Sequence, residues 1–142
     1  MADRVSSVSN KSKATTIATN VALTGSAATI GNTFDVRNNR RASVIATWTK
    51  HADETLLTVD VQGTVDGTTW TTLPVVVDGS ATISSGVAAA ALGALKYTRS
   101  VTGSFHLPLE TFGCRTIRVQ ASSTTSGSRG TLSLIAAGEH DS

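Results

Sequence analysis

The clearest pattern in the chain is an alternation of apolar and polar residues that ends in a turn signal. Leu57, Val59, Val61 and Val65 alternate with polar residues. This period of two is typical of a strand with one buried side. The following Asp66-Gly67 pair predicts a tight hairpin turn, because glycine adopts positive φ without a steric penalty. A loop of two or four residues places Gly63 opposite Trp70, so we expect the indole to cover the glycine.

Similar patterns recur along most of the chain, separated by turn residues. We expect further strands at residues 17–23, 29–36, 43–49, 97–101, 105–109, 115–121 and 131–137. Between them, residues 75–95 are rich in alanine and glycine, and both a short helix and a mobile loop stay open as interpretations. The pattern predicts an all-β fold. We expect an antiparallel β-sandwich or jelly-roll-like barrel with about eight strands and flexible termini.

The polar ends of the chain suggest three parts. We expect a flexible N-terminal arm at residues 1–15, a single β-sandwich domain at residues 16–138 and a polar tail at residues 139–142. The arm contains Val5 and Val8 among serine, asparagine and the basic residues Lys11 and Lys13. It is interpreted either as a disordered tail or as a segment that becomes ordered on a neighbouring subunit.

Composition excludes several classes of function and structure but does not by itself identify a function. Twelve Lys and Arg residues against ten acidic ones give a net charge of +2, too small an excess to predict binding to a specific nucleic acid. The single cysteine, Cys114, excludes an internal disulfide. With no targeting segment at the N-terminus and no long apolar run, we expect synthesis in the cytoplasm and no membrane association.

Catalytic and metal-binding patterns are weak. His51, Asp53 and Glu54 lie together in a polar turn, but the spacing of metal ligands is missing. Acid–base pairs among Asp53, Glu54, Asp60 and Asp66 are disfavoured, because carboxylates on strands and turns usually face solvent or cap a turn. We therefore expect no enzymatic activity, no cofactor and no metal. Trp48, Trp70 and Tyr97 form either a sugar-stacking platform or, as we favour, parts of the core and hairpin.

Two groups of residues are candidates for contact with a partner. Arg37, Arg40 and Arg41 lie in one predicted turn, where they form either a phosphate-contacting patch or, more often, a solvated source of salt bridges. Ile45 and Ile135 lie on the outward side of their predicted strands. A sandwich buries only one side of each sheet, so we expect a second subunit or a crossing loop to cover them. Self-association, with a trimer favoured, follows from the first alternative.

The order of several segments resembles a known group of proteins. The hairpin 61-VQGTVDGTTW-70 is followed by 105-FHLPL-109, 115-RTIRVQA-121 and 130-GTLSL-134. Over about residues 30–137, this order is similar to that of the small β-sandwich virion proteins of tailed bacteriophages, which include head decoration proteins and other minor structural proteins. The same hairpin also occurs in bacterial surface modules and sugar-binding modules.

The resemblance implies a structural protein of the virion, and a capsid decoration (cement) protein that binds and stabilises the outer head shell is favoured. Its partners would be the major capsid protein or other virion proteins, and the resemblance brings no catalytic residues. Two alternatives stay open: a structural protein of the phage neck or tail, and a carbohydrate-binding or adhesin-type β-sandwich module. Val5, Val8, Lys11, Lys13, Arg37, Arg40, Arg41, Ile45 and Ile135 are the candidate contacts.

Overall fold

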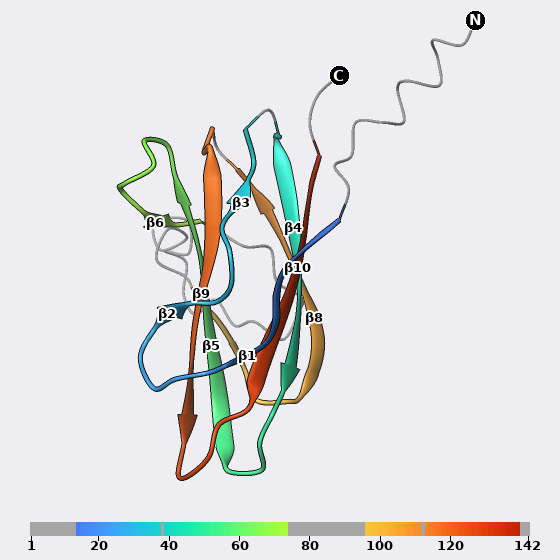
Figure 1. Ribbon diagram of the computed structural model, residues 1–142, viewed down its shortest axis with the longest axis vertical. Helices are drawn as coiled ribbons and strands as arrows, with labels where there is room; N and C mark the ends of the chain where they lie inside the picture. The colour runs from blue at the N-terminus through green and yellow to red at the C-terminus, as the bar shows by residue number, and fades with distance from the viewer. Residues whose placement is uncertain (1–13, 38, 74–95, 112, 140–142) are drawn as a thin grey trace, which may run out of the picture.

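The protein is an all-β sandwich (Figure 1). A computed structural model describes residues 14–37, 39–73, 96–111 and 113–139, and these contain strands, turns and loops but no helix. The strands are β1 (Thr15–Ala22), β2 (Ala28–Thr29), β3 (Phe34–Asp35), β4 (Arg41–Thr49), β5 (Glu54–Thr64), β6 (Thr71–Thr72), β7 (Tyr97–Arg99), β8 (Gly103–Glu110), β9 (Thr116–Thr125) and β10 (Thr131–Glu139). The alanine-rich segment and most of the predicted arm and tail lie outside the described residues.

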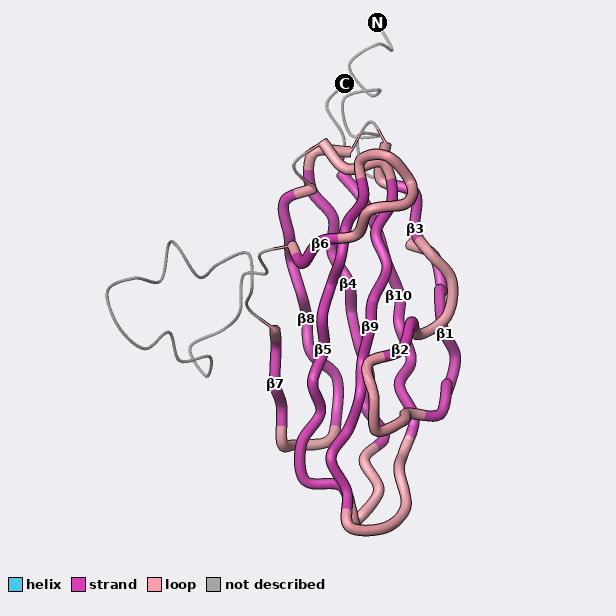
Figure 2. The backbone as a smooth tube through the Cα atoms, turned by 90° about the vertical axis from the view of Figure 1, so that its left-hand side faces the viewer, coloured by secondary structure: helices cyan, strands magenta, loops and turns pink. Residues whose placement is uncertain are grey.

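Two antiparallel sheets form the two layers. The four-stranded sheet has the order β1-β10-β4-β8. The six-stranded sheet has β9 and β5 at its centre; β2 and β3 pair along the free side of β9, and β6 and β7 along the free side of β5 (Figure 2). The prediction of an antiparallel sandwich is confirmed. The described residues form ten strands rather than about eight, partly because the expected strand at residues 29–36 is divided into the short strands β2 and β3.

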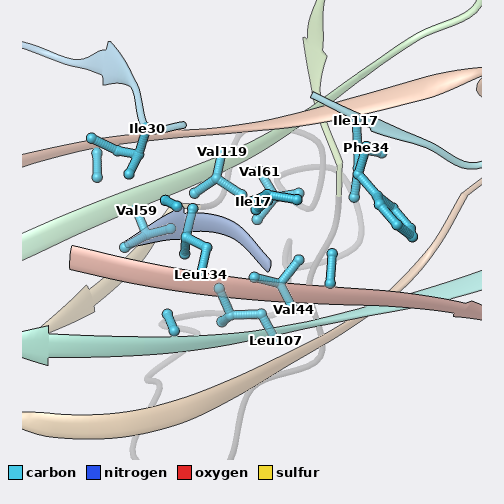
Figure 3. Packing of buried hydrophobic residues seen from close by; sticks show 14 of the residues in the cluster. Ile17, Ile30, Phe34, Val44, Val59, Val61, Leu107, Ile117, Val119 and Leu134 are labelled. Atoms are coloured by element: carbon cyan, nitrogen blue, oxygen red, sulfur yellow. The ribbon is translucent and has the colours of Figure 1, made fainter. Parts of the chain in front are cut away.

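The core lies between the inward sides of the two sheets (Figure 3). The inward positions alternate with exposed ones along β4 and β10, as the period of two predicts. On the four-stranded sheet the core includes Val44, Ala46, Trp48, Leu107, Leu132 and Leu134, and on the six-stranded sheet Leu57, Val59, Val61, Ile117, Val119 and Ala121. Most of these side chains are β-branched or small, and both suit close packing between pleated sheets.

One side of the sandwich is closed where β7 of one sheet approaches β8 of the other. The rings of Tyr97 and Phe105 stack, with centroids 4.8 Å apart. The guanidinium carbon of Arg99 lies 5.0 Å from the Phe105 centroid, and Arg99 Nε donates to the Val101 carbonyl at 2.7 Å. The predicted strand 97–101 is therefore shortened to β7, because Arg99 turns back to close this side of the core.

A buried carboxylate ties both sheets together at the end of the sandwich that contains the β4–β5 turn. Glu54 is only 1% exposed, and its Oε1 accepts the backbone N–H of His51 at 2.8 Å. Trp48 Nε1 of β4, Ser123 Oγ of β9 and Glu54 Oε2 are buried without a partner at hydrogen-bond distance among the described residues. Trp48 and Ser123 nevertheless lie near enough to the carboxylate to affect its pKa. Burial raises the pKa of Glu54, but the nearby Ser123 hydroxyl, the His51 and Gly130 amides and the Trp48 indole together outweigh burial and lower the pKa below 4.5.

The expected continuous strand at residues 29–36 is wrong. It is divided into β2 and β3, which pair with different parts of β9. The interruption falls at Gly31, which has a φ of 73° and packs against β1 so closely that a Cβ would lie 1.9 Å from the Ile17 carbonyl oxygen. A glycine at positive φ cannot continue the regular strand, and the close approach leaves no space for another residue.

The expected contact of Trp70 with Gly63 is also wrong. Gly63 pairs with Thr71, because the loop between β5 and β6 spans residues 65–70 and is longer than a tight hairpin requires. Asp66 organises this loop by accepting the amides of Thr68 and Thr69 at 2.8 and 2.7 Å. Trp70 is instead half-buried on the outer side of the sheet, and Val65, expected inward, is 69% exposed.

Gly63 faces the core, where a Cβ would lie 2.6 Å from Cys114 Sγ and 2.9 Å from Leu73 Cδ1. We predict that Gly63→Ala lowers the free energy of unfolding by about 1–3 kcal/mol, because both neighbours are buried and must shift. Urea denaturation measures the loss. The Gly63→Ala/Cys114→Ala double variant removes Sγ and with it the steric conflict. Its loss of unfolding free energy should therefore be smaller than the sum of the losses in the two single variants. A Gly63→Ala variant as stable as the parent would contradict this packing.

Glu54→Gln should lower stability at pH 7 by about 1–3 kcal/mol, because a neutral amide accepts these hydrogen bonds more weakly. The lowered pKa gives the sign of the pH dependence. The stabilisation by the carboxylate is present above pH 4.5, its ordinary pKa. It is lost as the pH falls through the lowered pKa of Glu54 in the folded protein. Thermal unfolding between pH 7 and pH 3 should therefore show the two proteins converging at low pH. Glu110→Gln, which removes an exposed ion pair, is the control and should cost at most about 1 kcal/mol.

Candidate functional site

The outer side of the four-stranded sheet lacks charged side chains over most of its extent, and we refer to it as the docking face. It comprises Ser43, Ile45, Thr47 and Thr49 of β4, Ser104, His106 and Pro108 of β8, and Thr131, Ser133, Ile135 and Ala137 of β10. An ion pair between Arg41 and Glu110, 3.1 Å long, marks one end of this face. Hydroxyl groups bind one another within it, as Thr47 Oγ1 and Ser104 Oγ do at 2.8 Å.

Two exposed isoleucines lie side by side at the centre of the docking face. Ile135 of β10 pairs directly with Ile45 of β4, which pairs in turn with His106 of β8. Their side chains are 43% and 39% exposed. The sequence placed both isoleucines outward, and the sheet order brings them together although 90 positions separate them. Such a neutral surface loses little hydration energy when another molecule covers it, so it suits apolar contact with a partner.

The three arginines of the predicted patch lie where β3 ends and β4 begins. Arg37 forms a salt bridge with Asp35 at 2.7 Å, and Arg41 one with Glu110. Hydrogen bonds from the Arg37 side chain and backbone lower the pKa of Asp35. The backbone carbonyl of Arg40 accepts the side-chain hydroxyl of Thr111 at 3.1 Å. Arg37 and Arg41 therefore serve as sources of salt bridges, the alternative that the sequence favoured, and the patch is largely compensated in charge.

The four candidate contacts in the arm, Val5, Val8, Lys11 and Lys13, lie outside the described residues. The first strand residue that the structure describes is Thr15, which pairs with Ala136 near the end of β10. The arm therefore joins the domain at the edge strand of the four-stranded sheet. This edge strand is irregular, with register shifts between Thr16 and Ala18 and between Ala18 and Val21. Such bulges discourage pairing with another strand at an edge.

The residues considered for metal binding or catalysis are used in structural contacts. His51 Nδ1 accepts the Asp53 amide at 3.1 Å, so this nitrogen is not available as a ligand. Asp60 is 6% exposed and accepts Gln62 Nε2 and Thr72 Oγ1. Among the described residues, no group of three histidine, cysteine or acidic side chains has the arrangement of a metal site.

Asp66 and Cys114 have clear structural roles. The backbone amides of Thr69 and Thr68, followed by the hydroxyls of Thr69 and Thr64, lower the pKa of Asp66 far below its usual range. The Asp66 carboxylate is thus a loop organiser. Burial of Cys114 beside Gly63 raises the pKa of its thiol, which opposes the formation of the reactive thiolate.

The three aromatic residues of the possible sugar platform are not brought together. Trp48 is fully buried in the core, Tyr97 is stacked on Phe105, and Trp70 lies on the outer side of the six-stranded sheet. Trp70 is therefore the member of this group that a ligand on the sheet surface can reach. In the part of the chain that the structure describes, no helix has the length and hydropathy needed to cross a membrane.

The comparisons with known proteins bear on the fold. No protein-family profile matches the chain, and no curated protein matches it. Among solved structures, the chain is similar to the SPBc2 prophage-derived protein YomS, with a TM-score of 0.56 and 11% sequence identity. The similarity covers 90% of this chain and 91% of that chain. At this identity the likeness establishes a shared fold, whereas function has to be argued from the surface.

The isoleucine pair should matter little for folding. We predict that Ile45→Thr/Ile135→Thr lowers the free energy of unfolding by less than about 1.5 kcal/mol in total, because both side chains are already partly hydrated. Ile117→Thr makes the same change at a core position that is 0% exposed. It should cost about 2 kcal/mol or more, since it buries an extra hydroxyl and leaves a void. Denaturant melts of the two variants compare these losses; equal losses per residue would mean that the isoleucine pair belongs to the core.

Proposed function

We propose that this chain is a structural protein of a bacteriophage virion and, more narrowly, a capsid decoration protein that attaches to the outer head shell through the docking face. The observation that carries the proposal is the exposed pair of Ile45 and Ile135 at the centre of an uncharged sheet surface. The likeness in fold to a prophage-derived protein supports a phage origin. The order of segments that resembles phage virion proteins supports the same assignment.

Attachment to a shell fits the physical character of this face. A decoration protein binds a surface that is already assembled, so its contact region has to remain soluble beforehand. Two isoleucines surrounded by threonine and serine hydroxyls suit both solubility and binding. The apolar area is small enough for the free protein to remain in solution, and the isoleucines are removed from water on contact. Each copy can bind weakly, since many copies on a symmetric shell gain from multivalent attachment if they also contact one another.

The N-terminal arm is proposed as a second point of attachment. Its mixture of valine, serine, asparagine and lysine lacks the apolar content for a core of its own. The domain begins at β1, on the edge of the sheet that carries the docking face. An arm that becomes ordered on the shell loses conformational entropy on binding, and this loss is offset by its tether to an already docked domain.

The proposal assigns no catalytic step to the chain. Three of the acidic residues considered for acid–base pairs accept hydrogen bonds that organise the fold: Glu54, Asp60 and Asp66. A role in the neck or tail of the particle would use the same docking face against a different shell protein. Location in the virion is therefore the first part of the proposal, and location on the head is the second.

Binding to undecorated capsids of the parent phage tests the docking face and the arm. After sedimentation of the particles, Ile45→Thr/Ile135→Thr should bind at least about tenfold more weakly, since about 1 kcal/mol is lost at each position. Val65→Thr/Val101→Thr is the matched control, because these valines are 69% and 61% exposed but lie in loops and are not among the residues of the face. Deletion of residues 1–13 should also weaken binding and leave the sandwich folded.

Equal occupancy by the isoleucine variant and the parent protein would contradict the docking face. Equal occupancy by the deletion variant would contradict the role of the arm alone. If the parent protein does not bind capsids and is recovered from purified tails, the head assignment is wrong while the virion assignment stands. If mass spectrometry of purified virions detects none of it, both fail.

Self-association through apolar surface is also proposed, with a trimer favoured. Contacts around a threefold axis join two different patches of each copy, so they do not have to cover the isoleucine pair that faces the shell. Sedimentation equilibrium at tens of micromolar should give a mass about three times that of the 14.6 kDa chain. A monomer both in solution and in cross-linked particles would contradict this part of the proposal.

A further inference from the structure

The outer side of the six-stranded sheet is built differently from the docking face, and we refer to it as the polar face. Its outward positions on the two central strands and their neighbours are Thr29, Thr58, Asp60, Gln62, Thr72, Arg118, Gln120 and Ser122, with Trp70 beside them. Leu56 of β5, which is 37% exposed and pairs with Thr124, lies on the same outer side but outside this set, at the end of the strand remote from Arg118. The set itself contains no aliphatic side chain. The polar face therefore suits a ligand rich in hydroxyl and charged groups.

A chain of hydrogen bonds crosses this face and fixes its side chains. Thr72 Oγ1 donates to Asp60 Oδ1 at 2.8 Å, and Gln62 Nε2 donates to Asp60 Oδ2 at 3.0 Å. The carbonyl oxygen of the same Gln62 amide accepts Arg118 Nε at 2.8 Å. Because the carboxylate can only accept, it determines which end of the Gln62 amide faces Arg118. The position of the guanidinium is thus set by two residues on β5.

Arg118 is held from a second direction as well. Its guanidinium carbon lies 4.4 Å from the centre of the Trp70 ring. This stacking and the bond through Nε restrain the planar group without using its terminal nitrogens. Within the part of the chain that the structure describes, no acceptor or carboxylate engages these terminal nitrogens. Arg118 is half-buried and ends the chain of hydrogen bonds with its fork of donors free.

We propose that the polar face binds an acidic carbohydrate, whose carboxylate Arg118 takes in two parallel hydrogen bonds. A planar guanidinium matches a carboxylate in this bidentate arrangement, and a group that is already oriented loses less entropy on binding. The restraint by Gln62 and Trp70 supplies this orientation. The inference does not depend on the proposed attachment to capsids, because it uses the opposite side of the sandwich.

The surroundings of Arg118 favour a carbohydrate over an acidic peptide. Gln120 Nε2 bonds Thr29 Oγ1 at 3.3 Å, and with Thr58, Thr72 and Ser122 it spreads amide and hydroxyl groups around the arginine. Sugars present many hydroxyls to such groups, whereas a peptide usually requires apolar pockets or a free strand edge. Both central strands, β5 and β9, are paired on each side, so the polar face offers no free edge at its centre.

The experiment is an NMR titration of the ¹⁵N-labelled full chain with a tetramer of galacturonic acid. The Trp70 indole N–H and the Arg118 Nε–H are the reporters. Saturable shifts of both are expected, with a much smaller response to neutral maltotetraose and to tetraglutamate. Arg118→Lys retains the charge but loses the fork, and it should weaken binding at least about tenfold. Arg129→Lys is the matched control, since Arg129 donates to the carbonyl of Ser123, five positions along β9 from Arg118, and is not among the residues of the polar face.

Several results would overturn the proposal. One is the lack of saturable shifts at about ten millimolar ligand, where even a weak site is occupied. Another is equal affinity for maltotetraose and for the galacturonic acid tetramer, which would mean that the carboxylate is not recognised. Equal or tighter binding of tetraglutamate would make the polar face a peptide site. Unchanged affinity in a folded Arg118→Lys variant would mean that Arg118 does not bind the ligand. The comparison of the three ligands uses the unaltered chain, so it does not depend on whether a variant folds.

Discussion

Two packed sheets can bury only one side of each, and this constraint shapes the rest of the molecule. Every outward side chain has to be hydrated, bonded to its neighbours or covered by another molecule. The six-stranded sheet bonds the polar side chains at the middle of its outer side to one another, from Thr72 to Arg118, and leaves only the terminal nitrogens of Arg118 free in this series. The four-stranded sheet leaves Ile45 and Ile135 in contact with water. The proposed docking function follows from this difference.

The core is formed largely by apolar residues at every second position of the long strands. This alternation is visible in the sequence, which is why so much of the fold could be predicted from it. The inward Leu57, Val59 and Val61 of β5 and the outward Ile45 of β4 and Ile135 of β10 were identified correctly, since each strand is long enough for its period of two to stand out. Glu54 was treated as a surface carboxylate, yet it ties the sheets together. Its partners Trp48, Ser123 and Gly130 are distant in sequence, and a pattern along one strand contains no information about them.

Errors arose where a single residue broke the local pattern. Gly31 interrupts a strand because β1 passes too close for any side chain, a tertiary effect that the sequence does not reveal. Asp66 lengthens the β5–β6 loop by binding its backbone, which shifts Trp70 away from Gly63 and onto the surface. That shift placed the indole beside Arg118, so the polar face could not have been predicted from the expected register. The outward positions of Ile45 and Ile135 were predicted, whereas their pairing required the sheet order.

The central claim is that the docking face lies against the virion while the loops stay open to water. Hydroxyl-radical footprinting of particle-bound and free protein, read out by mass spectrometry, tests it most directly. The account predicts that oxidation of Ile45 and Ile135 falls several-fold on the particle, while oxidation of the more exposed Val65 and Val101 is unchanged. Unchanged oxidation of the isoleucines, with the two valines protected instead, would contradict it.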